Sequence, residues 1–119
     1  MRVVRKIDKQ RLAKEADKLF SKFIRGRDKH CLYCGSTYDL DCAHIVGQKR
    51  ARLRFDPQNA IALCRLHHTD WHAHQNIWEG WFHSRYPDRW AYLEKYRYVT
   101  EKPDYEAVIK KFQWILDGS

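Results

Sequence analysis

Residues 31–34 read CLYC and residues 64–67 read CRLH, and these two stretches decide the fold. Each places two residues between a pair of metal-binding side chains, a spacing at which a tight turn aims both at one ion. Together Cys31, Cys34, Cys64 and His67 complete a tetrahedral shell of three thiolates and one imidazole. The sequence therefore predicts a structural Zn²⁺ site. The alternative is that these cysteines are small buried hydrophobic residues.

The apolar pattern outside these pairs predicts the remaining elements. Two strands are expected over 40–46 and 60–63, joined by a basic loop and followed by a helix over 66–83. An apolar stripe at helical spacing predicts an earlier helix, beginning at Asp8 and stopping at Gly26. Shorter helices are expected over 88–98 and 103–116. The sequence thus predicts one α+β domain over 1–119, made of a basic N-terminal helix (1–29), a zinc-bound finger (30–85) and a C-terminal helical extension (86–119).

The positive charge is concentrated near the start of the chain. The 119 residues have a formal net charge of +8, and residues 1–30 hold 11 Lys and Arg against 4 Asp and Glu. Such an excess favours nucleic acid as a partner, although a solvated helix face is the plain alternative. No apolar run approaches the roughly 20 residues that cross a bilayer, and the first residues do not form a secretory signal. We expect no membrane contact and a cytoplasmic location, in a bacterial or phage-infected host cell.

Four polar residues remain near the predicted zinc site. His68 and His72 are four apart on one predicted helix, so both imidazoles can share a second cation. Asp41 and His44 lie on the preceding strand. The alternative is that His68 and His72 belong to a solvent-facing polar surface.

The segments DCAHI (41–45) and NAIALC (59–64), followed by His67, His68 and His72, resemble the HNH, or ββα-metal, endonuclease family. More narrowly, the chain is similar to small phage HNH proteins, including the lambda NinG (Rap) recombination nuclease group. The resemblance covers about residues 10–85. It implies a zinc-bound ββα-metal finger, flanked here by the basic N-terminal helix and the C-terminal helices.

The resemblance also implies roles. His44 matches the general base, Asn59 matches the residue that braces the finger loop and helps to orient the base, and His68 and His72 match ligands of the catalytic ion. Many members have a metal-binding Asp or His where Ala43 stands.

Asp41 shares the strand face of that alanine. It reaches the catalytic ion directly, through a water, or not at all. Imidazole ligands suit Zn²⁺, Ni²⁺, Co²⁺ or Mn²⁺, while Mg²⁺ prefers oxygen, so the identity of this divalent ion stays open.

Two basic surfaces are assigned to DNA phosphates, which position a substrate without reading its sequence. The first is the loop between the strands, where Arg52 has a structural packing role as its alternative. The second is the exposed face of the N-terminal helix. Their residues are Lys49, Arg50, Arg52 and Arg54 in the loop, and Lys14, Lys18 and Lys22 in the helix.

The leading hypothesis is a metal-dependent HNH endonuclease that nicks or cuts DNA, leaving 5′-phosphate and 3′-hydroxyl ends, in phage DNA packaging or recombination. Its expected partners are DNA and proteins of those phage processes, with the oligomeric state open. The main alternative is a non-catalytic zinc-finger module that binds DNA in a phage assembly, which Ala43 favours. A nuclease toxin acting on RNA is the third hypothesis.

Overall fold

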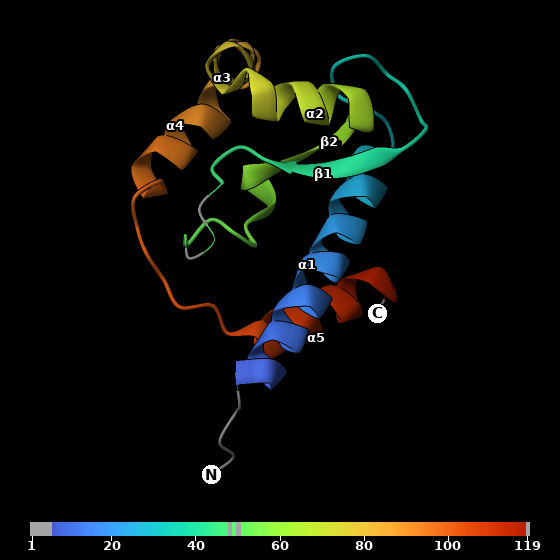
Figure 1. The fold of residues 1–119 in the computed structure, drawn as a ribbon, viewed down its shortest axis with the longest axis vertical. Helices are drawn as coiled ribbons and strands as arrows, with labels where there is room; N and C mark the ends of the chain where they lie inside the picture. The colour runs from blue at the N-terminus through green and yellow to red at the C-terminus, as the bar shows by residue number, and fades with distance from the viewer. Residues whose placement is uncertain (1–5, 48, 50, 119) are drawn as a thin grey trace.

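The computed structural model describes residues 6–47, 49 and 51–118, and it has the predicted α+β architecture (Figure 1). A two-stranded hairpin lies between α2 on one side and α1 on the other. The elements are α1 (Lys6–Asp28), β1 (Leu40–His44), a 3₁₀ turn (Pro57–Asn59), β2 (Ala60–Cys64), α2 (Arg65–Ala73), α3 (Gln75–Arg85), α4 (Pro87–Tyr96) and α5 (Tyr105–Leu116). None of the described helices is long and apolar enough to span a membrane.

The hairpin is the centre of the structure. β1 and β2 pair antiparallel, with Leu40 opposite Cys64 and His44 opposite Ala60. Every residue of β2 is buried, as its unbroken run of small and apolar residues indicates. The backbone of Ala62, at the middle of β2, also has partners beyond the sheet. Its N–H donates to the Asp28 carboxylate (2.9 Å), and its carbonyl accepts from the Leu32 N–H (3.0 Å), so the end of α1 and the segment after it cover this strand edge.

Helix α1 packs its apolar stripe against the hairpin and α5. Ala16, Phe20 and Ile24 are buried on this stripe, and the Phe20 ring lies 5.4 Å from the Phe112 ring of α5. Figure 1 shows α1 and α5 side by side. The predicted apolar face is therefore confirmed.

The predicted stop of this helix at Gly26 is wrong, because α1 continues to Asp28. Contacts of its last turn account for the extension. The Arg27 guanidinium donates to the carbonyls of Pro57 (2.8 Å) and Ala60 (2.7 Å), next to the contact that Asp28 makes with β2. The helix ends where Lys29 adopts a left-handed conformation with φ 66°.

The predicted helix over 66–83 is divided into α2 and α3 at His74. This residue leaves the helical region, with φ −138° and ψ 53°, while its N–H still donates to the Asp70 carbonyl. The Asp70 carboxylate accepts from the Trp78 indole N–H (2.7 Å), so one side chain joins the two helices across the bend. Apolar periodicity continues through the bend, and for that reason it conceals the break.

The loop between the strands is closed by Asn59, a buried polar residue. Its Oδ1 accepts from the Val46 N–H (2.8 Å), and its Nδ2 donates to the carbonyls of Val46 (2.9 Å) and Leu53 (3.1 Å). Three backbone groups of an irregular segment thus receive partners from one side chain. The loop is also held by the segment after α4, because the Arg52 N–H donates to the Val99 carbonyl (3.0 Å).

We expect Asn59→Ala to lower the free energy of unfolding by about 3 kcal/mol, because it leaves buried backbone groups without partners. The measurement is denaturant unfolding of the zinc-loaded protein. The matched control is Asn76→Ala on an exposed turn of α3, which should change the stability by no more than about 0.5 kcal/mol. Equal stability of the two variants would contradict this account of the loop.

Candidate functional site

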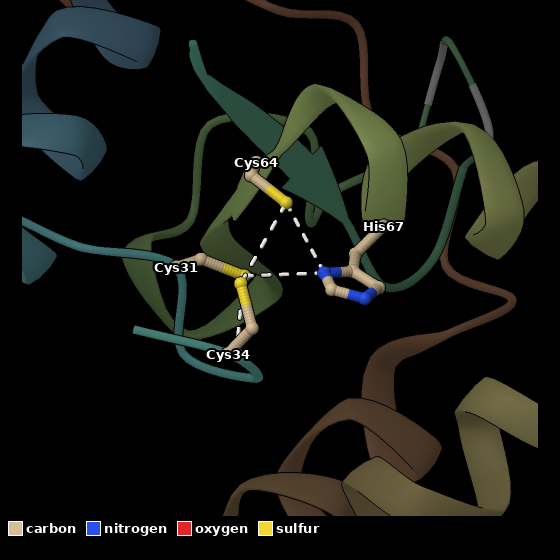
Figure 2. Close-up of side chains that lie close together, drawn as sticks. All are labelled: Cys31, Cys34, Cys64 and His67. Carbon is tan, nitrogen blue, oxygen red and sulfur yellow. Dashed lines mark hydrogen bonds between the residues drawn. The ribbon is translucent and has the colours of Figure 1, made fainter. Parts of the chain in front are cut away.

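The predicted zinc ligands come together from three segments (Figure 2). Cys31 and Cys34 lie on the turn between α1 and β1, Cys64 is the last residue of β2, and His67 lies in the first turn of α2. Their four ligand atoms all lie within 4.8 Å of one another. The Cys34 and Cys64 sulfurs are 3.8 Å apart, and a tetrahedral site with Zn–S bonds of about 2.3 Å requires about this separation. The cluster therefore fits a structural zinc.

The turn that carries the first two cysteines is fixed by its own backbone. The Cys31 N–H donates to the Ser36 carbonyl, and the Gly35 N–H donates to the Cys31 carbonyl, both at 2.8 Å. Gly35 has φ 81°, a conformation that residues with a side chain rarely adopt. The turn therefore favours a glycine at position 35.

The surroundings of Cys31 favour its thiolate, the form that binds metal. Burial raises the pKa of this thiol, but hydrogen bonds from the backbone of Cys34, Cys64 and Tyr33 and from the His67 side chain outweigh burial and lower the pKa to about 6. The turn is therefore prepared for a cation before one binds.

Aromatic side chains form a wall beside the zinc cluster. The Tyr33 ring lies 4.7 Å from the His67 ring and 4.8 Å from the Trp78 ring. Trp71, Trp78 and Phe82 are buried, so the apolar face of α2 and α3 is mainly core. These rings therefore pack the interior and are not available to stack on nucleic-acid bases.

A second group of histidines does not include the zinc ligand His67. His44, His68 and His72 all line one pocket of about 420 Å³. The Nε2 atoms of His68 and His72 lie 3.2 Å apart, so both rings present the same nitrogen to one point. Two imidazole nitrogens in this arrangement can hold one divalent ion.

Asp41 lies behind this pair. Its carboxylate is 3.1 Å from Nδ1 of His68, the nitrogen that faces away from His72, and 3.3 Å from the Arg65 guanidinium. Burial raises the pKa of Asp41, but these two partners outweigh it and hold the pKa below its ordinary value. In the described part of the chain, the ligand atoms of Asp41, His68 and His72 do not converge as those of the zinc cluster do. Of the three possibilities for Asp41 (direct contact with the ion, contact through a water, or none), this geometry does not favour direct contact.

His44 is held in one orientation. Its Nε2 lies 2.8 Å from the Arg54 carbonyl, which can only accept a hydrogen bond, so Nε2 carries the hydrogen and Nδ1 keeps the lone pair. Its ring stacks on Phe20 with centroids 5.6 Å apart. Burial lowers the pKa of His44, so the ring is neutral near pH 7 and Nδ1 can accept a proton.

Asn59 lies in the interior of the loop. Its side-chain partners are the backbone groups of Val46 and Leu53, and Leu53 directly precedes the residue whose carbonyl receives His44. Asn59 thus fixes the loop next to the carbonyl that receives His44, and the bracing role that the resemblance implies stays a prediction.

The basic loop residues lie in different environments. Lys49 is exposed and lines the histidine pocket. The Arg52 guanidinium lies 3.9 Å from the centroid of the Tyr96 ring and donates to the Tyr92 hydroxyl (3.4 Å), so it has the packing role given as its alternative. Arg50 lies outside the described residues.

Arg54 also lines the pocket, but its guanidinium has protein partners. It forms an ion pair with Asp17 of α1 (2.6 Å) and donates to the Tyr105 hydroxyl of α5 (3.2 Å). Neither partner is predictable from the sequence, because local patterns hold no signal for contacts between residues 37 and 51 positions apart. The predicted DNA-binding lysines of α1 are exposed and recur every four residues, so they share one face: Lys14, Lys18 and Lys22.

Cys42 lies beside the same pocket. It is partly buried and packs against the core formed by α1 and α5. Burial raises its pKa to about 12, which keeps the thiol protonated and unsuited to metal binding.

The comparison with family models adds the deciding observation, because residues 31–76 match the model described as HNH endonuclease. Residues 31–76 are thus similar to the HNH endonuclease family. Enzymes of this family are phosphodiester hydrolases that act on DNA and generally use divalent metals. No curated protein and no solved structure matches the chain. The match gives no support to the narrower phage subgroup.

The HNH segment contains the zinc cluster and the three histidines of the pocket. It excludes α1, α4 and α5, and therefore also Asp17 and Tyr105. The histidine pocket and its loop thus lie in the segment that matches the family, and α1 and α5, which lie outside that segment, contact the loop through Arg54.

We expect His68→Ala to retain about one tightly bound zinc per chain, because the pocket histidines are separate from the Cys₃His cluster. Cys64→Ser should lose that zinc and unfold at a lower denaturant concentration. Metal content after dialysis, measured by mass spectrometry, tests both. Loss of all zinc from His68→Ala would show that the ligands are divided incorrectly.

Proposed function

We propose that the chain is a metal-dependent endonuclease that hydrolyses DNA phosphodiester bonds, with His44 as general base and His68 and His72 as ligands of one divalent ion. The observation that carries the proposal is the meeting of these three imidazoles at one pocket within the HNH segment. Lys49, exposed at the same pocket, supplies positive charge for the phosphates beside the scissile bond, while the Arg54 charge is paired with Asp17.

The donor atoms of the pocket fit such an ion. Two convergent imidazole nitrogens suit Zn²⁺, Ni²⁺, Co²⁺ or Mn²⁺ better than Mg²⁺, and they leave positions open for oxygen ligands. When bound, the ion would stabilise the charge that develops on the phosphate and on the leaving 3′ oxygen. Asp41 accepts from Nδ1 of His68 and so keeps Nε2 free for the ion, which makes it a positioning residue in this proposal. Ala43 is buried and offers no donor atom.

His44 performs the proton transfer in this scheme. Because Nε2 donates to the Arg54 carbonyl, the proton of the attacking water goes to Nδ1. The lowered pKa keeps this nitrogen unprotonated before the reaction. Attack on phosphorus with departure of the 3′ oxygen leaves 5′-phosphate and 3′-hydroxyl ends.

A DNA-binding zinc module without catalysis is the second candidate, and the missing donor at Ala43 favours it. The remaining expectations stay predictions: a single domain over 1–119, a cytoplasmic location, a role in phage packaging or recombination with partner proteins of those processes, and DNA contacts by the loop and by α1.

We expect His44→Ala to reduce plasmid nicking at least about a hundredfold, because a positioned general base contributes this much or more. Supercoiled plasmid is incubated with Mg²⁺, Mn²⁺, Ni²⁺, Co²⁺ or Zn²⁺ in turn. The control is His83→Ala, which removes an exposed histidine of α3 that lies outside the pocket and stacks on Trp90. Equal activity of His44→Ala and wild type would remove His44 as the base. Absence of cleavage by wild type in all five metals would favour the binding module.

The pH dependence of cleavage gives a separate prediction. The base acts only when neutral, so the rate should rise with pH and level off once His44 has lost its proton. Because burial lowers the pKa of His44, the midpoint of this rise should fall below the ordinary histidine value of about 6.5. Single-turnover rates at saturating metal provide the profile, and a midpoint above that value would contradict the assignment.

A further inference from the structure

Arg54 connects His44 to two helices outside the HNH segment. The Arg54 carbonyl accepts from Nε2 of His44 at 2.8 Å. Its guanidinium donates to both carboxylate oxygens of Asp17, from Nη2 at 2.6 Å and from Nε at 3.2 Å. The remaining Nη1 donates to the Tyr105 hydroxyl (3.2 Å) and to the Lys49 carbonyl (3.1 Å). One residue therefore joins the candidate base, the middle of α1 and the start of α5.

The position of the Arg54 carbonyl depends on these contacts. Arg54 lies between the strands, in a segment without a helix or strand of its own. On one side, the Asn59 side chain fixes the neighbouring Leu53 carbonyl. On the other side, the Arg54 guanidinium holds the loop through its pairing with Asp17. A two-point contact between a guanidinium and a carboxylate fixes the direction of the arginine side chain as well as its distance. The Arg54 side chain is 18% exposed and the Asp17 side chain 43%, so water reaches the carboxylate but largely not the guanidinium that anchors the loop.

We propose that Asp17 is a positioning residue for the reaction, assisted by Tyr105, and that it acts through Arg54 to hold His44 in the tautomer with Nδ1 free. The inference rests on the proposed function, because it concerns the base of that reaction. When the guanidinium is released, the loop carbonyl loses its anchor and Nε2 loses its fixed acceptor. A fraction of the His44 rings then carries the hydrogen on Nδ1, where it blocks proton transfer.

A purely electrostatic role of Asp17 and a positioning role predict different kinetic changes when its carboxylate is neutralised. Removing a carboxylate beside the pocket makes the surface more positive, and this effect alone would tighten DNA binding and lower KM. A positioning role predicts a lower kcat instead. The split between the two kinetic constants therefore separates the two roles.

The test is Asp17→Asn, with Asp8→Asn as its matched control. Both residues are carboxylates on α1 paired with an arginine, Asp8 with Arg11 at 3.0 Å, so both variants remove one negative charge from one helix. We expect Asp17→Asn to lower kcat about ten- to a hundredfold without raising KM, and Asp8→Asn to stay within about twofold of wild type. Tyr105→Phe, a milder change, should lower kcat in the same direction by a smaller factor. If Asp17→Asn fails to fold, Tyr105→Phe decides the outcome. An unchanged kcat in Tyr105→Phe would then overturn the proposal.

Nitrogen NMR of the His44 ring, in zinc-loaded protein without added catalytic ion, provides a readout besides activity. Wild type should show a single tautomer with hydrogen on Nε2, and Asp17→Asn should show a mixture. Wild type that cuts DNA in none of the five metals defeats the proposed function, whereas an unchanged tautomer in Asp17→Asn defeats this inference alone. In an Arg54→Gln background, Asp17→Asn should have no additional effect on kcat. A full effect in that background would show that Asp17 acts by another route, and it would overturn the proposal.

Discussion

A tetrahedral ligand shell is the constraint on which the rest of this structure depends. Cys31 and Cys34 bring the segment after α1 to the shell, Cys64 brings the end of β2, and His67 brings the start of α2. Because β2 is followed directly by α2, fixing these ligands also fixes the angle between strand and helix. His68 is the next residue along the helix, rotated by roughly 100° from His67. The direction of the pocket histidines is thus determined by the neighbouring metal cluster.

The hairpin lies at the boundary of two hydrophobic cores. One core contains Ile61 and Leu63 of β2 together with Trp71 and Phe82, and the other contains Ala60 with residues of α1 and α5. The histidine pocket opens on the side of α1, where His44 stacks on Phe20. The matched segment supplies the three histidines of the pocket, while α1 supplies one of its walls. Removing that helix would expose the face on which the His44 ring rests.

The sequence predicted the features that depend on short spacings. The Cys₃His cluster, the pairing of His68 with His72 and the order of strands and helices all follow from patterns a few residues long. Contacts between distant segments were not predictable in this way. The pairing of Arg54 with Asp17 spans 37 residues, and the side of His68 on which Asp41 lies depends on how a strand crosses a helix. The bend at His74 was hidden because apolar residues continue at helical spacing on both sides of it.

The chain has four cysteines, and their environments divide them into two chemical groups. Cys42, with its pKa raised to about 12, stays protonated and reacts slowly with oxidants and alkylating reagents. The other three are the thiols of the metal cluster. Oxidation of this protein is therefore expected at the cluster thiols, where forming a sulfenic acid or a disulfide would remove a ligand from the metal site. The reaction rate of the three cluster thiols with an alkylating reagent thus reports on whether the metal site is intact, because Cys42 contributes little to that rate.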